Sequence, residues 1–159
     1  MSTHNSSPLT PNRYLIIGGA GFIGINLIDH LLKMNPDVKI RVLDNLSVGT
    51  RENLTEVCPS PSVEFVKGDI RDYDTCLNAC DGIDAIVHLA AHAGVIPSIE
   101  DPNYDFEVNV KGTLNLLHAS VKNGVEKFIF ASSNAPLGNQ APPMSEEKVP
   151  KPLSPYGAS

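Results

Sequence analysis

Tryptophan is absent from this 159-residue sequence, and charge of neither sign is concentrated along it. Its 12 basic and 18 acidic residues give a net charge of −6 without a basic stripe, which disfavours a nucleic-acid partner. No apolar run approaches the roughly 20 residues that cross a bilayer, and the first residues lack the apolar segment of a secretory signal. We therefore expect a cytoplasmic protein that binds neither nucleic acid nor a membrane.

Cysteine is also scarce, and its spacing excludes a C-x-x-C motif. The three cysteines, Cys58, Cys76 and Cys80, are odd in number, which suits a reducing compartment. Cys76 and Cys80 are four residues apart and would share one helix face, where we expect buried thiols rather than a metal site. The length and the 42% apolar content predict one globular domain.

The most informative stretch is residues 14–24, which read Tyr-Leu-Ile-Ile-Gly-Gly-Ala-Gly-Phe-Ile-Gly. A short apolar run ends in glycines and a helical apolar pattern begins at once, which predicts a strand, a tight turn and a helix. Glycines allow positive φ and a close ligand approach, and the first N–H groups of the helix suit a pyrophosphate. The glycines fit two spacings: G-x-G-x-x-G at Gly19, Gly21 and Gly24, and G-x-x-G-x-x-G at Gly18, Gly21 and Gly24.

Apolar runs and turn residues place the remaining elements. We expect strands at 13–17, 39–43, 63–67, 84–89 and 127–131, helices at about 22–34, 73–80 and 101–123, and the start of a further helix at Tyr156. Strands that alternate with helices imply an α/β fold, a Rossmann-type doubly wound parallel sheet of strand order 3-2-1-4-5. Residues 1–12 are expected to be a disordered tail before a domain at 13–159, and the proline-rich residues 136–155 an irregular loop.

Two aspartates follow the second and third expected strands. Asp44 lies twenty residues after Gly24, where a carboxylate can accept both ribose hydroxyls of an adenosine and repel a 2′-phosphate. This position favours NAD over NADP, with an ordinary loop-capping aspartate as the alternative. Asp69 and Ile70 could flank the adenine, although an aspartate after a strand is also a common turn residue.

Seven short motifs occur in order along residues 13–159. They are GGAGFIG at 18–24, DNLS at 44–47, GDIR at 68–71, HLAA at 88–91, NVKGT at 109–113, ASS at 131–133 and SPYGAS at 154–159. Together they resemble the extended short-chain dehydrogenase/reductases, in particular the nucleotide-sugar epimerases and dehydratases. The resemblance implies a Rossmann domain that holds NAD, in a protein that acts on a nucleoside-diphosphate sugar.

The resemblance also assigns roles to single positions. The pyrophosphate would be lined by Gly18, Gly21, Phe22, Ile23 and Gly24. The adenosine ribose and nearby phosphate would be held by Asp44, Asn45 and Ser47, and the adenine by Asp69 and Ile70. The cofactor would pass over Leu89, Ala90 and Ala91, with Asn109 as a polar anchor on the long helix. The catalytic residues would be Ser133 and Tyr156, which match the family's serine or threonine and the tyrosine of its Y-x-x-x-K motif.

The catalytic assignment depends on what these side chains can do. A phenol has an unperturbed pKa of about 10, so a nearby lysine and the nicotinamide charge would be needed to make Tyr156 a base at neutral pH. Tyr156 would then take the proton of a sugar hydroxyl, and Ser133 would hydrogen-bond the same oxygen. Without the resemblance, Ser133 reads as a turn hydroxyl and Tyr156 as an exposed aromatic. His88 is expected to be a hydrogen-bonded core histidine, and His92 a loop residue near the substrate.

Two departures from the family pattern affect the functional expectation. The lysine of Y-x-x-x-K would fall at position 160, so we expect the 159-residue chain to be catalytically crippled, its tyrosine on a frayed end, and the parent protein to be longer. Asn134 and Ala135 stand where dehydratases carry an acidic pair, which favours an epimerase.

The favoured function is an NAD-dependent 4-epimerase of a UDP-hexose or UDP-N-acetylhexosamine in polysaccharide biosynthesis. The alternatives are a dehydratase or reductase of similar substrates, and a non-catalytic NAD-binding module. The resemblance further implies a homodimer in which the long helix takes part. Apolar residues spaced to share one stripe of that helix are Phe106, Val110, Leu114, Leu117 and Val121.

Overall fold

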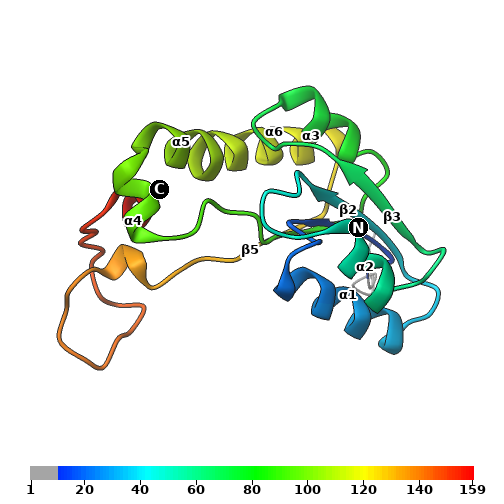
Figure 1. Cartoon of the computed structure of the whole chain (residues 1–159), viewed down its shortest axis with the longest axis horizontal. Helices are drawn as coiled ribbons and strands as arrows, with labels where there is room; N and C mark the ends of the chain where they lie inside the picture. Colours follow the sequence, from blue (N-terminus) through cyan, green and yellow to red (C-terminus); the bar gives the residue numbers. More distant parts are fainter. Residues whose placement is uncertain (1–10) are drawn as a thin grey trace, which may run out of the picture.

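A five-stranded parallel sheet forms the centre of the protein (Figure 1). The computed structural model describes residues 11–159. The strands are β1 (Arg13–Ile17), β2 (Lys39–Asp44), β3 (Val63–Lys67), β4 (Ala85–His88) and β5 (Lys127–Phe130). Their order, β3-β2-β1-β4-β5, confirms the expected α/β topology. The order reverses between β1 and β4, and in such sheets ligands bind beyond the carboxyl ends of the strands at this point.

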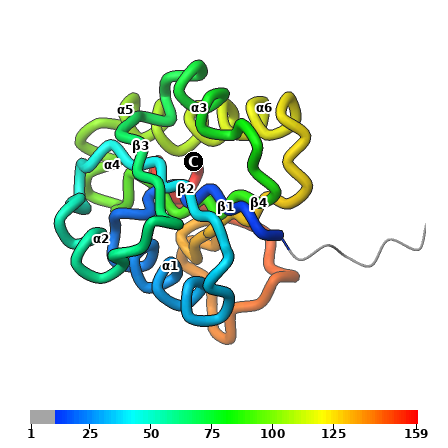
Figure 2. The backbone as a smooth tube through the Cα atoms, turned by 90° about the vertical axis from the view of Figure 1, so that its right-hand side faces the viewer, coloured from blue at the N-terminus to red at the C-terminus, as the bar shows by residue number. Residues whose placement is uncertain are grey.

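Helices cover both faces of the sheet (Figure 2). One face carries α1 (Phe22–Met34) and α2 (Arg51–Val57), and the other carries α3 (Tyr73–Ala79) and α6 (Thr113–Asn123). Beyond the sheet, α4 (Val95–Glu100) packs against α5 (Pro102–Phe106) and α7 (Pro155–Ala158). A 3₁₀ turn, η2 (Ala135–Leu137), precedes the irregular loop expected from the prolines.

The alternation of side chains along β1 supplies both halves of the core. Leu15 and Ile17 pack with residues of α3 and α6, whereas Ile16 packs with residues of α1 and α2. All three are buried, as expected for a central parallel strand with both faces covered. The expected thiols Cys76 and Cys80 are free and buried in the first of these cores. Burial raises the pKa of Cys76 to about 12, so this thiol is not a nucleophile at neutral pH.

The helix expected at 101–123 is divided. A π-helical segment, η1 (Glu107–Gly112), joins α5 to α6. The side of α6 that faces the core carries Leu116 and Ala119, while the expected apolar stripe is mostly exposed at Phe106, Leu114, Leu117 and Val121. The backbone just before α6 approaches the core closely, because a Cβ on Gly112, the last residue of η1, would lie 2.6 Å from Ile70 Cδ1.

The structure describes the two ends of the chain to different extents. Residues 1–10 of the expected tail lie outside the described residues, and the N–H of Asn12 donates to Asp84 Oδ2 at 3.1 Å. At the other end, the helix expected to start at Tyr156 is present as α7. The Ser154 hydroxyl accepts the N–H of Gly157 at 3.1 Å, and Ser159 Oγ lies 3.1 Å from Asn109 Nδ2. Within residues 11–159, no helix is both long and apolar enough to cross a membrane.

Candidate functional site

The glycine turn between β1 and α1 lies against the loop that follows β4. Gly18 has a φ of +76°, and a Cβ there would lie 2.8 Å from the backbone nitrogen of Ala90. A Cβ on Gly24 would lie 2.5 Å from Gly19 Cα, so the turn also packs closely on the first turn of α1. Gly21, the N-cap of α1, contributes no side-chain cap, which leaves the first N–H groups of this helix available to an anion.

Asp44, at the end of β2, joins two backbone segments through one carboxylate. Its Oδ2 accepts the N–H of Ala20 at 3.0 Å, and its Oδ1 accepts the N–H of Leu46 at 2.8 Å. A carboxylate has about four lone-pair positions, so each oxygen can still accept a hydroxyl. The loop after β2 continues over the glycine turn, because a Cβ on Gly49 would overlap the carbonyl oxygen of Ala20.

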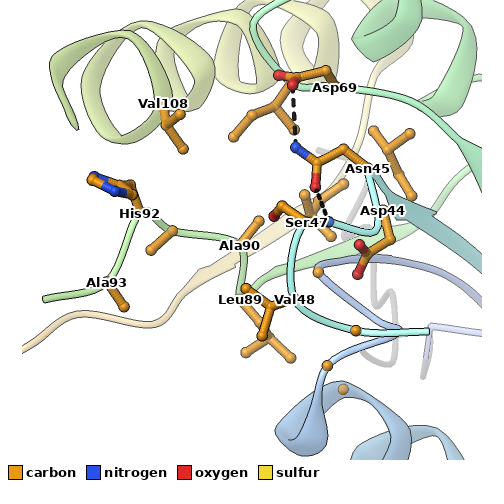
Figure 3. A pocket seen from close by; sticks show the side chains of 18 of the residues that line it. Asp44, Asn45, Ser47, Val48, Asp69, Leu89, Ala90, His92, Ala93 and Val108 are labelled. Carbon is orange, nitrogen blue, oxygen red and sulfur yellow. Dashed lines mark hydrogen bonds between the residues drawn. The ribbon is translucent and has the colours of Figure 1, made fainter. Parts of the chain in front are cut away.

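Asp69, two residues after the end of β3, faces this loop from the neighbouring strand. The Asn45 amide donates to Asp69 Oδ2 at 3.1 Å, and Asn45 Oδ1 accepts the N–H of Ser47 at 2.9 Å (Figure 3). The guanidinium of Arg71 also binds the Asp69 carboxylate, at 2.8 Å. This hydrogen bond from Arg71 is the main reason that the pKa of Asp69 falls to about 2. Asp69 is therefore a charged acceptor at neutral pH.

These residues line one cavity of about 740 Å³, a volume within the usual range of small-molecule and cofactor pockets. Every residue expected from the sequence to bind the cofactor lines this cavity except Asn109. Sequence reasoning did not assign a cofactor role to several further lining residues: Val48, Gly49, His92, Ala93, Tyr104 and Val108. Val48 and Gly49 directly follow the assigned Ser47, so this position in the loop, together with a glycine, was the signal available in the sequence.

Asn109, in the π-helical segment, holds the loop that follows β4. Its Oδ1 accepts the N–H of His92 at 2.8 Å, and its Nδ2 donates to the carbonyl of His92 at 3.2 Å. This pair of hydrogen bonds fixes the backbone that crosses the floor of the cavity at Leu89, Ala90 and Ala91. π-Helical turns are often found at functional sites, because they alter which side chains a helix presents.

A second, smaller cavity adjoins the first, and the two share Ala90, Ala91 and Ala131. Asn109, Ser133 and Tyr156 line this second cavity. Ser133 is exposed and its Oγ accepts the N–H of Ala135 at 3.1 Å, while Tyr156 is half-buried in α7. Two segments separated by the proline-rich loop therefore bring a hydroxyl and a phenol to the same small space beside the larger cavity.

His88 lies in β4 below this region and is buried, as expected. Its Nε2 lies 3.0 Å from Thr113 Oγ1, and the Thr113 hydroxyl donates to the carbonyl of Asn109 at 2.6 Å. Because that hydroxyl proton is already used, Nε2 must carry a proton and donate to Thr113. Burial lowers the pKa of His88 to about 4, so the ring is neutral. His88 is thus a structural support for Asn109.

Comparison with known proteins identifies this arrangement. Residues 14–159 match the sequence model of the NAD dependent epimerase/dehydratase family. The chain belongs to this family. A UDP-glucose 4-epimerase from Mycolicibacterium smegmatis is 43% identical over 149 residues, which are 92% of this chain and 47% of that protein.

Solved structures of other family members show the same fold. A UDP-glucose 4-epimerase from Thermus thermophilus in complex with NAD has a TM-score of 0.82 and 40% identity, covering 92% of this chain and 46% of that chain. A dTDP-glucose 4,6-dehydratase from Streptomyces venezuelae with NAD bound has a TM-score of 0.84 and 39% identity, covering 92% and 47%. The 159-residue chain therefore spans about half the length of the relatives that it matches.

Proposed function

We propose that this chain binds NAD in the larger cavity, with the adenosine at the Asp44 end. The observation that carries the proposal is the contact of the Asp44 carboxylate with the glycine turn, at 3.0 Å from the N–H of Ala20. Asp44 can accept the ribose hydroxyls beside the uncapped N-terminus of α1, which suits the pyrophosphate. The side chains of Phe22 and Ile23 are 85% and 66% exposed in the first turn, where the pyrophosphate would cover them.

The same residues support a preference for NAD over NADP. A 2′-phosphate would approach the Asp44 carboxylate directly, and two anions in contact repel. The adenine would lie between Asp69 and the loop at Asn45 and Ser47, with Ile70 beneath it.

For the whole protein we propose the activity of a nucleotide-sugar 4-epimerase. NAD supplies the hydride acceptor when it is bound. The phenolate of Tyr156 takes the proton of the sugar C4 hydroxyl, and the Ser133 hydroxyl hydrogen-bonds the same oxygen. The hydride from C4 passes to the cofactor and returns to the opposite face of the sugar, while Tyr156 gives the proton back. Their shared cavity next to the proposed cofactor cavity supports these roles.

The choice among family reactions rests on two residues after Ser133. Asn134 and Ala135 begin the turn η2, and neither side chain can act as the acid or base of a water elimination. This favours the epimerase, although the dTDP-glucose 4,6-dehydratase is equally similar in fold. The alternatives remain a dehydratase or reductase of similar substrates, and a non-catalytic NAD-binding module.

We also propose a UDP-hexose or UDP-N-acetylhexosamine as substrate, a role in polysaccharide biosynthesis in the cytoplasm, and a homodimer. The exposed apolar residues Leu114, Leu117 and Val121 of α6 support the homodimer, because a contiguous apolar face on a helix is typical of an interface.

The test of the activity uses this chain extended to the length of its relatives, with lysine expected at position 160. We expect conversion between UDP-glucose and UDP-galactose, and a loss of about 100-fold or more in kcat on Tyr156→Phe. A product that lacks the elements of water would instead support the dehydratase. An extended protein that binds NAD but converts no nucleotide sugar would support the binding module.

A further inference from the structure

A buried carboxylate lies beside the loop that follows β4. Asp105, in α5, is 0% exposed. Its Oδ1 accepts Asn109 Nδ2 at 3.2 Å, while its Oδ2 has no hydrogen-bond partner among the described residues. A buried carboxylate with one neutral donor is costly, because it has lost its hydration without full replacement.

The imidazole of His92 lies beside this carboxylate. His92 Nδ1 lies 3.5 Å from Asp105 Oδ1 and is itself buried, with no hydrogen-bond partner in the described part of the chain. A proton on Nδ1 would let the ring donate toward Asp105. In the neutral ring, the other nitrogen, Nε2, would then be a hydrogen-bond acceptor.

The position of His92 is closely restricted. Asn109 binds both its N–H and its carbonyl, and the ring packs edge-on against Tyr104 with centroids 4.9 Å apart. Tyr104 is in turn covered by the guanidinium of Arg71, 4.9 Å from the ring centroid. The rotamer of His92 is therefore set by packing as well as by Asp105.

His92 lines the larger cavity at the end opposite Asp44 (Figure 3). With the adenosine at Asp44, the extended dinucleotide would bring its second ribose toward this end. That ribose carries hydroxyl groups, which can donate to an unprotonated ring nitrogen.

We propose that His92 Nε2 accepts a hydrogen bond from a hydroxyl of the second, nicotinamide-bearing ribose, and that Asp105 is a positioning residue that fixes the His92 tautomer. This inference rests on the proposed function, since it assumes that NAD occupies the cavity. Tyr156 and Ser133 have no part in it.

The experiment measures binding to the 159-residue chain. NADH is titrated by its own fluorescence, and ADP-ribose and ADP are measured by competition with it. ADP lacks the second ribose, and ADP-ribose has it without nicotinamide. The variants are His92→Leu and His92→Gln, with His30→Leu on the exposed side of α1 as the control.

We expect His92→Leu to weaken the binding of NADH and of ADP-ribose by about three- to tenfold, which is the effect of one hydrogen bond. The affinity for ADP should not change. His92→Gln, which keeps an acceptor, should lose less. Equal losses for all three ligands would show that His92 only shapes the loop, and no loss for any would show that it does not touch the dinucleotide. A loss for NADH alone would show a contact to nicotinamide, and it would also overturn the assignment to the ribose.

Asp105 is tested by its coupling to His92. Asp105→Asn should weaken NADH binding as much as His92→Leu does. The double variant should bind NADH no more weakly than His92→Leu alone. In the nitrogen NMR spectrum at neutral pH, His92 should carry its proton on Nδ1, and Asp105→Asn should shift the proton toward Nε2. Additive losses, or a tautomer that Asp105→Asn does not change, would overturn the positioning role.

Failure of the proposed function gives a different result. If the folded wild-type chain binds neither NADH nor ADP, the NAD site itself is wrong. If the wild-type chain binds NADH and the His92 variants bind it equally well, only this inference fails.

Discussion

Replacing Gly18 with alanine would place a methyl group against the backbone of the β4 loop. Gly18 has a φ of +76°, and the added Cβ would lie 2.8 Å from the nitrogen of Ala90 and 2.9 Å from its Cα. Gly124 provides a matched control, because its φ of +68° is similar and a Cβ there would meet no atom within 4 Å. The two substitutions therefore share the backbone strain and differ in the contact.

The expected losses in the free energy of unfolding follow from the backbone strain and from the contact. Left-handed backbone costs a residue with a Cβ about 1–2 kcal/mol, which is the whole expected loss for Gly124→Ala. Gly18→Ala adds an overpacking cost of about 1–3 kcal/mol, because the atoms that must shift are backbone. Domains have about 5–15 kcal/mol of stability, so both variants should remain folded.

The assay is urea unfolding followed by circular dichroism, with NADH titrated by fluorescence on the folded variants. Gly18→Ala should lower the free energy of unfolding by at least about 1 kcal/mol more than Gly124→Ala does. It should also weaken NADH binding, because the turn can no longer lie against the β4 loop, whereas Gly124→Ala should not. Equal destabilisation by the two variants, or unchanged NADH binding by Gly18→Ala, would refute the close packing of the turn as the basis of the site.

Three further predictions concern other groups. Asp44→Asn should weaken NADH binding by about tenfold or more and reduce the preference over NADPH, and an unchanged preference would remove Asp44 from the ribose site. The pKa of His88 lies at about 4, below the ordinary 6.5, so between these pH values the unfolded chain binds more protons than the folded chain does. The free energy of unfolding should therefore fall as the pH drops from 6.5 to 4, by up to about 1.4 kcal/mol per pH unit. His88→Leu should reduce this slope in urea titrations. Leu117→Glu should convert the proposed homodimer to a monomer, as measured by light scattering, whereas the exposed control Lys122→Glu should leave it a dimer. If both variants remain dimers, the interface lies elsewhere.

The sheet was predictable because its signals are local. Each strand is a short apolar run, and the run before Gly18 is apolar at every position from 14 to 17, as a strand covered on both faces requires. Alternation with helices then restricts the topology to a few possibilities, since parallel crossovers are right-handed. Among these, the glycine turn after the first strand favoured the Rossmann order, which is the order observed.

The face of the long helix was not predictable in the same way. Apolar spacing marked Leu117 and Val121, but the residues that face the core include Ala119 and Ser120, which are small. The selection of this face depends on how closely the backbone approaches Ile70, and the exposed stripe is free for another partner. In the π-helical segment before α6, Asn109 hydrogen-bonds His92 and Asp105, and these partners are not evident from the apolar spacing of the sequence.

The candidate site divides similarly. The sequence placed Asp44 and Asp69 at strand ends, and the structure puts both in one cavity. It did not connect His92 with Asp105, because their proximity requires α5 to pack on the β4 loop through Asn109. The short helices α2 and α4 were missed because each depends on capping or packing, such as the Thr50 hydroxyl that accepts the N–H of Asn53 at the start of α2.

The most direct test of the proposed NAD site is a fluorescence titration of the purified chain with NADH and, in parallel, NADPH. The absence of tryptophan leaves the nicotinamide signal free of interference from indole. We predict saturable NADH binding and much weaker NADPH binding. A chain that is folded by circular dichroism and binds neither would contradict the claim that Asp44 and the glycine turn form a cofactor site.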